Sequence, residues 1–373
     1  MTATLTLTAC GGSGDSGSGG GDGGGNGADA ATATSAEDFG GMDALIEAAQ
    51  AEGTLNVIAL PPSWANYQEM LDTFSKKYDI EIDSANPDGS SQDEVNAVTS
   101  QKGQDRAPDV LDLGTSFAKQ AAAQDLLASY QVETWDDIPE NQKDPEGRWY
   151  NDYGGYISIG CNATVIAECP TSFEALLDPQ YARQVALNGN PTQAAAAFSG
   201  VWAAALANGG SLDDIGPGID FFKQIKAVGN FNPVEVTPAT VQSGETPLAI
   251  DWDYVNAGLT ETLAAEGVEW EVNVPSDGLF GSFYSQAISK FAPHPAAARL
   301  WEEFLYSDEG QNIWLKGLAR PVRLPAMEAA GTADEEALAA LPAVEGEADF
   351  PDDEQQTAAQ AVVAERWNAE ISG

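Results

Sequence analysis

The stretch GTLNVIALPPSWANY, residues 53–67, contains the strand, the loop and the helix start that decide the fold. Its apolar run at residues 54–60 predicts a short buried strand, because the run follows Gly53 and ends at two prolines. Residues 67–78 then carry apolar side chains at helical spacing. This order predicts one strand and helix unit of an α/β fold.

The same order of elements recurs further along the chain. Residues 80–84 and 109–113 predict two more strands, and helices are expected from about residue 92 and at residues 117–127. Strands that alternate with helices favour a parallel sheet with helices on both faces. Ligands bind such sheets beyond the carboxyl ends of the strands, so we expect the binding residues in the loops that follow them.

A second series of elements begins after an aromatic, glycine-containing strand that we expect at residues 149–159. The series consists of a strand, a polar loop, a buried helix and another strand, at residues 184–187, 188–192, 193–207 and 247–250. The two crossings between the series are expected near Tyr156 and Pro275. The chain is therefore divided into a first lobe and a second lobe, made of residues 39–155 with 275–373 and of residues 156–274.

The N-terminal region has the features of a lipoprotein. Residues 7–10 read LTAC, a small-residue sequence ending in the Cys10 before which lipoprotein signal peptidase cuts. We expect residues 1–10 to be the remnant of a signal peptide, residues 11–38 to be a disordered linker rich in Gly, Ser and Asp, and Cys10 to carry the lipid. Residues 1–8 supply neither a basic nor an apolar region, so we interpret the signal as starting upstream. The alternative is an ordinary thiol in a disordered tail.

The charge of the chain restricts its partners. The sequence has 58 acidic and 16 basic residues, a net charge of −42. This charge disfavours nucleic acid and anionic membrane surfaces as partners, and weakly favours a cationic small ligand. Acidic side chains that only solvate the surface are the alternative explanation. No apolar run approaches the ~18 residues of a membrane span, so the only membrane contact that we expect is the lipid anchor.

Cysteine and histidine are too few for most catalytic centres. With Cys10 assigned to the lipid, Cys161 and Cys169 remain, eight residues apart, as either a local disulfide or two buried thiols. The single histidine, His294, lies in a turn that enters a helix. One histidine disfavours Cys-His dyads, Ser-His-Asp triads and zinc sites, so we expect no metal and no cofactor.

Five segments in this order resemble one family of transport proteins. They are GTLNVIALPPSWANY, APDVLDLG, VALNGNPTQA, LAIDWDY and AARLWEEFLYSDEGQ, at residues 53–67, 107–114, 185–194, 248–254 and 297–311. The chain resembles the extracellular solute-binding lipoproteins of ATP-binding-cassette (ABC) importers. In particular it is similar to the type II periplasmic-binding-protein class, which includes polyamine, thiamine, iron(III) and aminoethylphosphonate binders.

The resemblance has consequences for fold and function. It implies two α/β lobes joined by two crossing strands, a solute captured when the lobes close, and permease subunits as partners. We expect a monomer on the outer face of the membrane that binds without turnover. Candidate ligand-binding residues follow the predicted strands or lie near the crossings, and they are Ser63, Trp64, Asn86, Asp88, Ser90, Thr115, Asn188, Asn190, Thr192, Asp251, Asp253, Tyr254 and Tyr284.

Acidic and aromatic residues alternate at residues 251–254. If this stretch stays extended, Asp251 and Asp253 share one face, because side chains two apart in a strand point the same way. Two carboxylates on one face suit an ammonium group, and Trp64 or a tyrosine adds a cation–π contact. The alternative is that Trp252 and Tyr254 are core residues and one aspartate caps the next helix.

An anionic group is the other ligand class that the loops allow. The helix expected from residue 193 and the one that follows Ser90 present backbone amides, which bind anions at helix N-termini. No Arg or Lys lies in the expected cleft loops, which disfavours a multiply charged anion. Iron(III) is the least favoured ligand, because Phe283-Tyr284 stands where that branch of the family commonly has two tyrosines.

Four functions are therefore compared. The first is capture of a cationic amine, similar to a polyamine or thiamine, for a permease. The second is binding of aminoethylphosphonate or another anion-bearing solute. The third is a surface hydrolase that uses Asp251 and Asp253, because two residues on the same face of a strand lie within the carboxylate spacing of glycosidases. The fourth is a receptor that signals to a sensor kinase.

Overall fold

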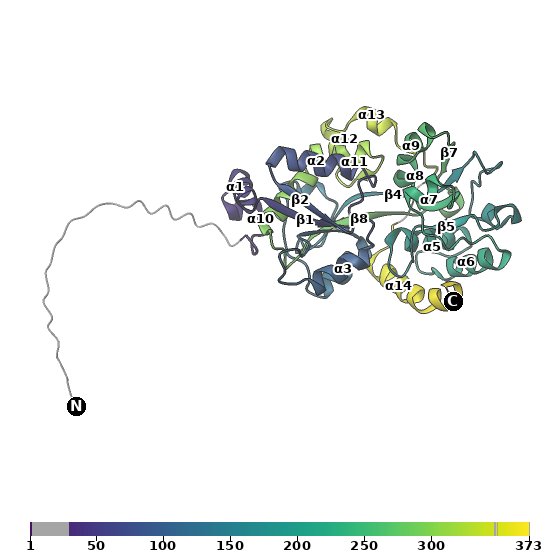
Figure 1. Cartoon of the computed structure of the whole chain (residues 1–373), viewed down its shortest axis with the longest axis horizontal. Helices are drawn as coiled ribbons and strands as arrows, with labels where there is room; N and C mark the ends of the chain where they lie inside the picture. Colours follow the sequence, from purple (N-terminus) through teal and green to yellow (C-terminus); the bar gives the residue numbers. More distant parts are fainter. Residues whose placement is uncertain (2–29, 347, 349, 373) are drawn as a thin grey trace.

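The computed structural model describes residues 1, 30–346, 348 and 350–372, which form two α/β lobes (Figure 1). Residues 2–29, including Cys10, lie outside the described residues. The linker was expected to extend to residue 38, and this boundary is wrong. Ala33 and Ala36 are buried, and the Arg299 Nε donates to the Ala33 carbonyl at 2.8 Å. The folded chain therefore starts by residue 33, because a buried arginine holds its backbone.

The first lobe begins with the strand and helix order read from the sequence. Its first elements are α1 (Met42–Glu52), β1 (Thr54–Ile58), α2 (Tyr67–Tyr78), β2 (Glu81–Ala85), α3 (Ser91–Ser100), β3 (Val110–Gly114) and α4 (Thr115–Ala123). β1 and β2 pair in parallel. α2 buries Tyr67, Met70 and Phe74 at helical spacing, and it ends at Asp79, which has a left-handed φ of 57°. The expected helix at residues 117–127 is shorter than predicted and ends at Ala123.

The second lobe holds the middle of the chain. Its elements are β5 (Val185–Leu187), α5 (Ala195–Ala207), α6 (Gly216–Val228), α7 (Pro238–Gln242), β6 (Leu248–Trp252), α8 (Asp253–Gly258), α9 (Thr260–Ala265) and β7 (Trp270–Asn273). β5 pairs with β6 in parallel. The apolar helix expected at residues 193–207 is α5, and eleven of its residues, from Ala195 to Ala205, are buried. Its burial follows from the near absence of polar side chains.

Two long strands connect the lobes. β4 (Tyr150–Asn162) pairs antiparallel with β8 (Gly281–Ile288) near its start and with β6 towards its end. The main sheet therefore runs through both lobes in the order β3-β8-β4-β6-β5, with β7 and β9 (Arg320–Pro321) also paired to β4. At the end of β4, Cys161 forms a disulfide with Cys169, with a Cα–Cα distance of 5.9 Å. The parallel pairs lie inside the lobes, and the connecting strands are antiparallel.

After β8 the chain returns to the first lobe and then leaves it again. The returning helices are α10 (Pro295–Leu305), α11 (Asp308–Lys316), α12 (Leu324–Ala330) and α13 (Glu335–Ala339). α10 packs against α1, and α11 packs against α2. The last helix, α14 (Asp353–Trp367), instead packs on α6 (Figure 1). The assignment of all of residues 275–373 to the first lobe is therefore wrong at its C-terminal end.

Candidate functional site in the cleft between the lobes

A cavity of about 200 Å³ lies between the two lobes. The first lobe contributes the loops after β1 and β2, the first turn of α3 and strand β3. The second lobe contributes the loop after β5, the start of α5, residues 235–238 and the end of β6. These are the carboxyl ends of strands, where ligands of α/β proteins bind. Seven predicted site residues line the cavity, namely Ser63, Trp64, Asp88, Ser90, Asn188, Asp251 and Tyr284.

The lobes touch at the edges of this cavity. The Gln92 amide donates to the Gln193 carbonyl at 3.4 Å, and the Trp64 and Tyr254 rings lie 5.8 Å apart, edge to face. Gly114 of β3 faces Ala195 of α5 so closely that a Cβ on the glycine would lie 2.4 Å from the alanine Cβ. Because even one methyl group does not fit there, Gly114 allows the lobes to close to this distance.

Asp251 is the buried acid of the second-lobe wall. Its side chain is fully buried, its Oδ2 accepts from the Asn188 amide at 2.8 Å, and its Oδ1 accepts from the Trp252 backbone at 2.7 Å. Burial raises the pKa of Asp251 to about 7, although both hydrogen bonds oppose the shift. Near neutral pH, a cation that enters the cavity therefore favours loss of the Asp251 proton.

The first-lobe wall contains two acids that the sequence interpretation missed, Glu94 of α3 and Asp112 of β3. The Glu94 Oε2 accepts from the Asp112 backbone amide at 2.9 Å. Burial raises the pKa of Glu94 well above its usual range, and the neighbouring Asp112 adds to the shift. The pKa of Asp112 is also raised, again by burial. The sequence contains one signal for Asp112, which is an acid inside the apolar strand VLDLG. A buried acid in a strand needs a specific partner, so Asp112 could have been predicted as a functional or network residue.

Asp112 belongs to a hydrogen-bond network that reaches the connecting strands. Its Oδ2 accepts from the hydroxyls of Tyr67, at 2.9 Å, and Tyr153, at 2.7 Å. The Trp64 indole N–H donates to the Tyr153 hydroxyl at 2.8 Å, and the Gln286 amide donates to the Tyr67 hydroxyl at 3.0 Å. One acid in the cavity wall is thus linked to α2, β4 and β8.

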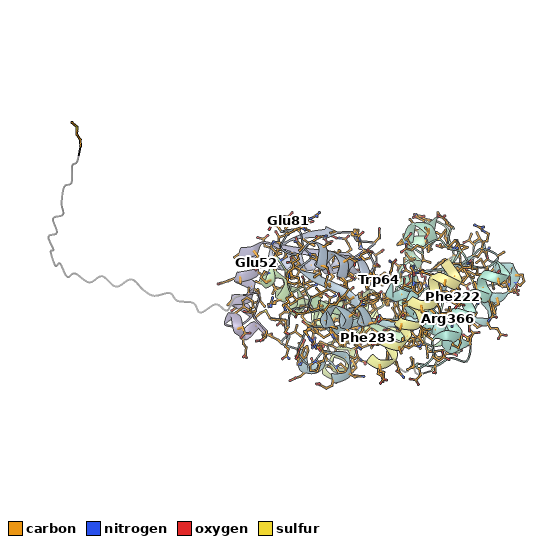
Figure 2. The ribbon with its side chains drawn as sticks, turned by 90° about the horizontal axis from the view of Figure 1, so that it is seen from below. Glu52, Trp64, Glu81, Phe222, Phe283 and Arg366 are labelled. Atoms are coloured by element: carbon orange, nitrogen blue, oxygen red, sulfur yellow. A yellow bond between two sulfur atoms is a disulfide. The ribbon has the colours of Figure 1, made fainter. Side chains whose placement is uncertain are left out.

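Aromatic rings form the side of the cavity at the crossings. Trp64 and Tyr284 line it, with ring centroids 5.7 Å apart in an edge-to-face arrangement. Tyr153 stacks on Tyr284 at 5.7 Å and meets Tyr254 edge to face at the same distance. Figure 2 shows Trp64 between the two halves of the molecule. This wall offers ring surface to a ligand next to the three acids.

A family match decides what kind of protein has this cleft. Residues 105–345 match the family described as bacterial extracellular solute-binding protein. The chain belongs to this family. Members act outside the cytoplasm and bind small solutes, so the resemblance to the solute-binding proteins of ABC importers is confirmed. No curated protein matches the sequence significantly.

Solved structures agree with the two-lobed fold of this solute-binding protein. The periplasmic binding protein AfuA from Actinobacillus pleuropneumoniae, with fructose-6-phosphate bound, is 20% identical, with a TM-score of 0.67 over 86% of this chain and 99% of that one. Iron-bound HitA from Pseudomonas aeruginosa is also 20% identical, with a TM-score of 0.59 over 83% of this chain and 99% of that one. A putative spermidine/putrescine ABC transporter protein from Listeria monocytogenes is 15% identical, with a TM-score of 0.57 over 84% and 98% of the two chains. The expected type II fold is therefore confirmed.

Asp253 does not face the cleft of the solute-binding protein. The chain turns into α8 at this residue, so the extended geometry that was expected to align Asp251 and Asp253 ends one residue too early. The Asp253 Oδ2 instead pairs with the Arg320 Nη1 at 2.6 Å, and its Oδ1 accepts from the Tyr156 backbone at 2.9 Å. Tyr254 is buried in the core beside it. The expectation of two carboxylates on one face was wrong.

Four other predicted residues lie outside the cavity lining. Thr115 is buried, and its hydroxyl bonds to the Phe283 carbonyl at 2.9 Å. Asn190 and Thr192 close a turn, in which the Asn190 Oδ1 accepts from the Thr192 backbone at 3.0 Å. Asn86 has a left-handed φ of 42° and accepts from the Gly89 backbone, which shapes the loop after β2. These residues position cleft loops and do not line the cavity.

The charges of the lining all have one sign. Five acids line the cavity, namely Asp88, Glu94, Asp112, Glu235 and Asp251, and no Lys, Arg or His is among its described lining residues. The N-terminal ends of α3 and α5 also face the cavity, through Gly89 to Ser91 and Ala194 to Ala196.

Within the described part of the chain, no group of three or more His, Cys, Asp or Glu side chains is arranged to hold a metal ion. None of the described helices is long and apolar enough to cross a membrane.

Proposed function

We propose that this solute-binding protein captures a small cationic amine between its lobes and delivers it to the permease subunits of an ABC importer. The observation that carries the proposal is the cavity lining, which has five acids and no base among its described residues. Glu94, Asp112 and Asp251 are buried, and a buried acid without a cation is costly unless it binds a proton. An ammonium group relieves this cost, so the site favours a cation over a neutral solute.

The energies are sufficient for a useful affinity. Each charge-assisted hydrogen bond from an ammonium group to a carboxylate contributes up to ~1.5–3 kcal/mol. A cation–π contact with Trp64 or Tyr284 adds ~0.5–2 kcal/mol. Two such hydrogen bonds and one cation–π contact, each at the upper end of its range, reach the ~8 kcal/mol of a micromolar binder. Among proteins of the same fold, one from Listeria monocytogenes is titled a putative spermidine/putrescine transporter, and another structure is titled a GABA receptor.

An anion-bearing solute is the second candidate. Two helix N-termini, those of α3 and α5, face the cavity from opposite lobes, and helix N-termini bind anionic groups. A solute with both an amine and a phosphonate or carboxylate, such as aminoethylphosphonate, suits this combination of amides and acids. The acids disfavour a solute that carries only negative charge.

The hydrolase interpretation loses its catalytic pair. It required Asp251 and Asp253 on one face, whereas Asp253 is held by Arg320 away from the cavity.

We also propose that Cys10 carries a lipid that anchors the protein to the outer face of the membrane. Mass spectrometry of the protein from its native membrane tests this, because the thioether lipid adds a defined mass to Cys10.

Isothermal titration calorimetry tests the ligand class. Putrescine, spermidine, thiamine and aminoethylphosphonate are each titrated into the protein, and at least one amine is expected to bind with saturation. Asp251→Asn is expected to weaken that binding at least tenfold, while Asp72→Asn, at an exposed position on α2, leaves it unchanged. Binding of acetate or phosphate with no binding of any amine overturns the proposal.

A further inference from the structure

The C-terminal segment, residues 340–372, starts on the first lobe and ends on the second. It follows α13, which packs on α11 in the first lobe, and it ends with α14 on α6 in the second. Nearly all of it lies beyond residue 345, where the family match ends. The family match therefore covers only the first residues of this segment.

Ionic and aromatic contacts fix the end of the segment to the second lobe. The Arg366 Nη2 pairs with the Asp220 Oδ1 of α6 at 2.5 Å, and the Trp367 ring meets the Phe222 ring at 5.4 Å. The Lys226 Nζ donates to the Ile371 carbonyl at 2.6 Å. Figure 2 shows Arg366, a residue of α14, close to Phe222 of α6. The end of the chain therefore moves with the second lobe.

Other contacts hold the start of the segment beside the connecting strands. The Arg320 Nη2 donates to the Pro342 carbonyl at 2.9 Å, and the same guanidinium pairs with Asp253 of the second lobe. The Phe350 ring packs against the Phe283 ring of β8 at 5.6 Å. These contacts place Pro342 beside Arg320 of β9, which pairs with β4, and Phe350 beside β8.

The start of α14 closes a second gap between the lobes. Pro351 and Gln356 line a small space of about 20 Å³ together with Thr115 of α4 and Phe198 of α5, which belong to different lobes. α14 itself contacts both α4 and α6. This space and the ligand cavity share Ala195, which meets Gly114 across the lobe boundary. The segment thus lies along the edge where the lobes separate when the cleft opens.

We propose that the C-terminal segment is a strap that limits how far the lobes open. Two crossing strands alone form a hinge, and the segment adds a third connection outside it. Opening the cleft separates Gly114 from Ala195 and must also break the contact between α4 and α14 or the contacts that hold α14 on α6. The strap therefore keeps the empty protein close to its closed arrangement, and a larger closed population raises the apparent affinity for a solute. This inference does not depend on which solute binds.

Pulsed electron–electron distance measurement on the ligand-free protein tests the strap. Spin labels are attached to Lys76→Cys on α2 and Glu261→Cys on α9, two exposed positions on different lobes, in a Cys10→Ser background. A chain that ends at residue 345 is expected to gain a population with longer label distances. Phe350→Ala in the full chain is expected to lower the ratio of closed to open molecules by about two- to tenfold, the range for one aromatic pair.

The comparison with an intact strap uses Glu354→Gln, a change at an exposed position of α14, which is expected to leave the distances unchanged. If the shortened chain fails to fold, the full-length Phe350→Ala and Arg366→Ala variants decide the question. Distances that are the same in these folded variants as in the parent protein overturn the proposal.

Discussion

The two walls of the cavity hold their acids in different ways. In the first lobe, Asp112 accepts from two phenol hydroxyls inside a network that reaches α2, β4 and β8. In the second lobe, Asp251 accepts from one side-chain amide and from the backbone of the next residue. A carboxylate with several buried partners supports the structure around it, whereas one with few partners is freer to respond to a ligand. The first wall therefore contributes more to stability and the second more to ligand response.

The pH dependence of stability tests the second wall most strongly. The folded-state pKa of Asp251 is about 7, above its usual value of 3.8, so the folded protein binds the proton more tightly than the unfolded chain. Its contribution to the free energy of unfolding is present at low pH and decreases as the pH rises from about 4 to about 7. Relative to Asp251→Asn, the ligand-free protein is expected to lose about 3 kcal/mol between pH 4.5 and 7.5. Urea unfolding at several pH values measures this, and equal pH slopes for the two proteins contradict it.

Removal of the first-wall acid tests its structural role. Asp112→Ala leaves the buried hydroxyls of Tyr67 and Tyr153 without their acceptor, which is expected to lower the free energy of unfolding by about 2–3 kcal/mol. Asp251→Ala is expected to cost less, about 1 kcal/mol, because the Asn188 side chain and the Trp252 backbone amide lose an acceptor but no buried hydroxyl does. Asp112→Asn keeps an acceptor and serves as the control. Equal losses for the two alanine variants at pH 7, measured in urea, remove the distinction between the walls.

Binding of the amine compares the walls directly. Glu94→Gln keeps the size of the side chain but cannot ionise when an amine binds, and it is expected to weaken binding about tenfold, or ~1.4 kcal/mol. The free energy of unfolding is expected to change less, because the amide oxygen still accepts from the Asp112 backbone. Calorimetry with the best amine of the panel measures the first quantity and urea unfolding the second. A large loss of stability with unchanged binding assigns Glu94 to the structure alone.

The smallest expected effect concerns the link between Trp64 and the network. Trp64→Phe keeps an aromatic ring in the cavity wall and removes the donor to the Tyr153 hydroxyl. We expect a loss of about 1 kcal/mol in the free energy of unfolding and less than about a threefold change in amine affinity. Thermal unfolding and calorimetry check both values. A tenfold or larger loss of affinity shows that the indole itself contacts the ligand.

Much of the fold was readable from local sequence. The stretch around residues 53–67 contains β1, the loop that carries Trp64 and the start of α2. Ser90 caps α3, and its side chain accepts from the Asp93 backbone in a capping box. These features depend on neighbours in the chain, through hydrophobic spacing and side-chain bonds to nearby amides. The place of α14 on the second lobe depends instead on Phe222 and Asp220, which are far away in sequence.

The sequence by itself determined the order of strands and helices, the family resemblance and the loops that meet at the cleft, because each rests on local patterns. Only the tertiary structure decided which acids face the cavity. The sequence predicted the same role for Asp253 as for Asp251, but α8 begins at Asp253 and its side chain pairs with Arg320. Glu94 and Asp112 were not predicted as site residues, yet both line the cavity. The direction of a side chain depends on how distant elements pack, and a linear pattern contains no information on that packing.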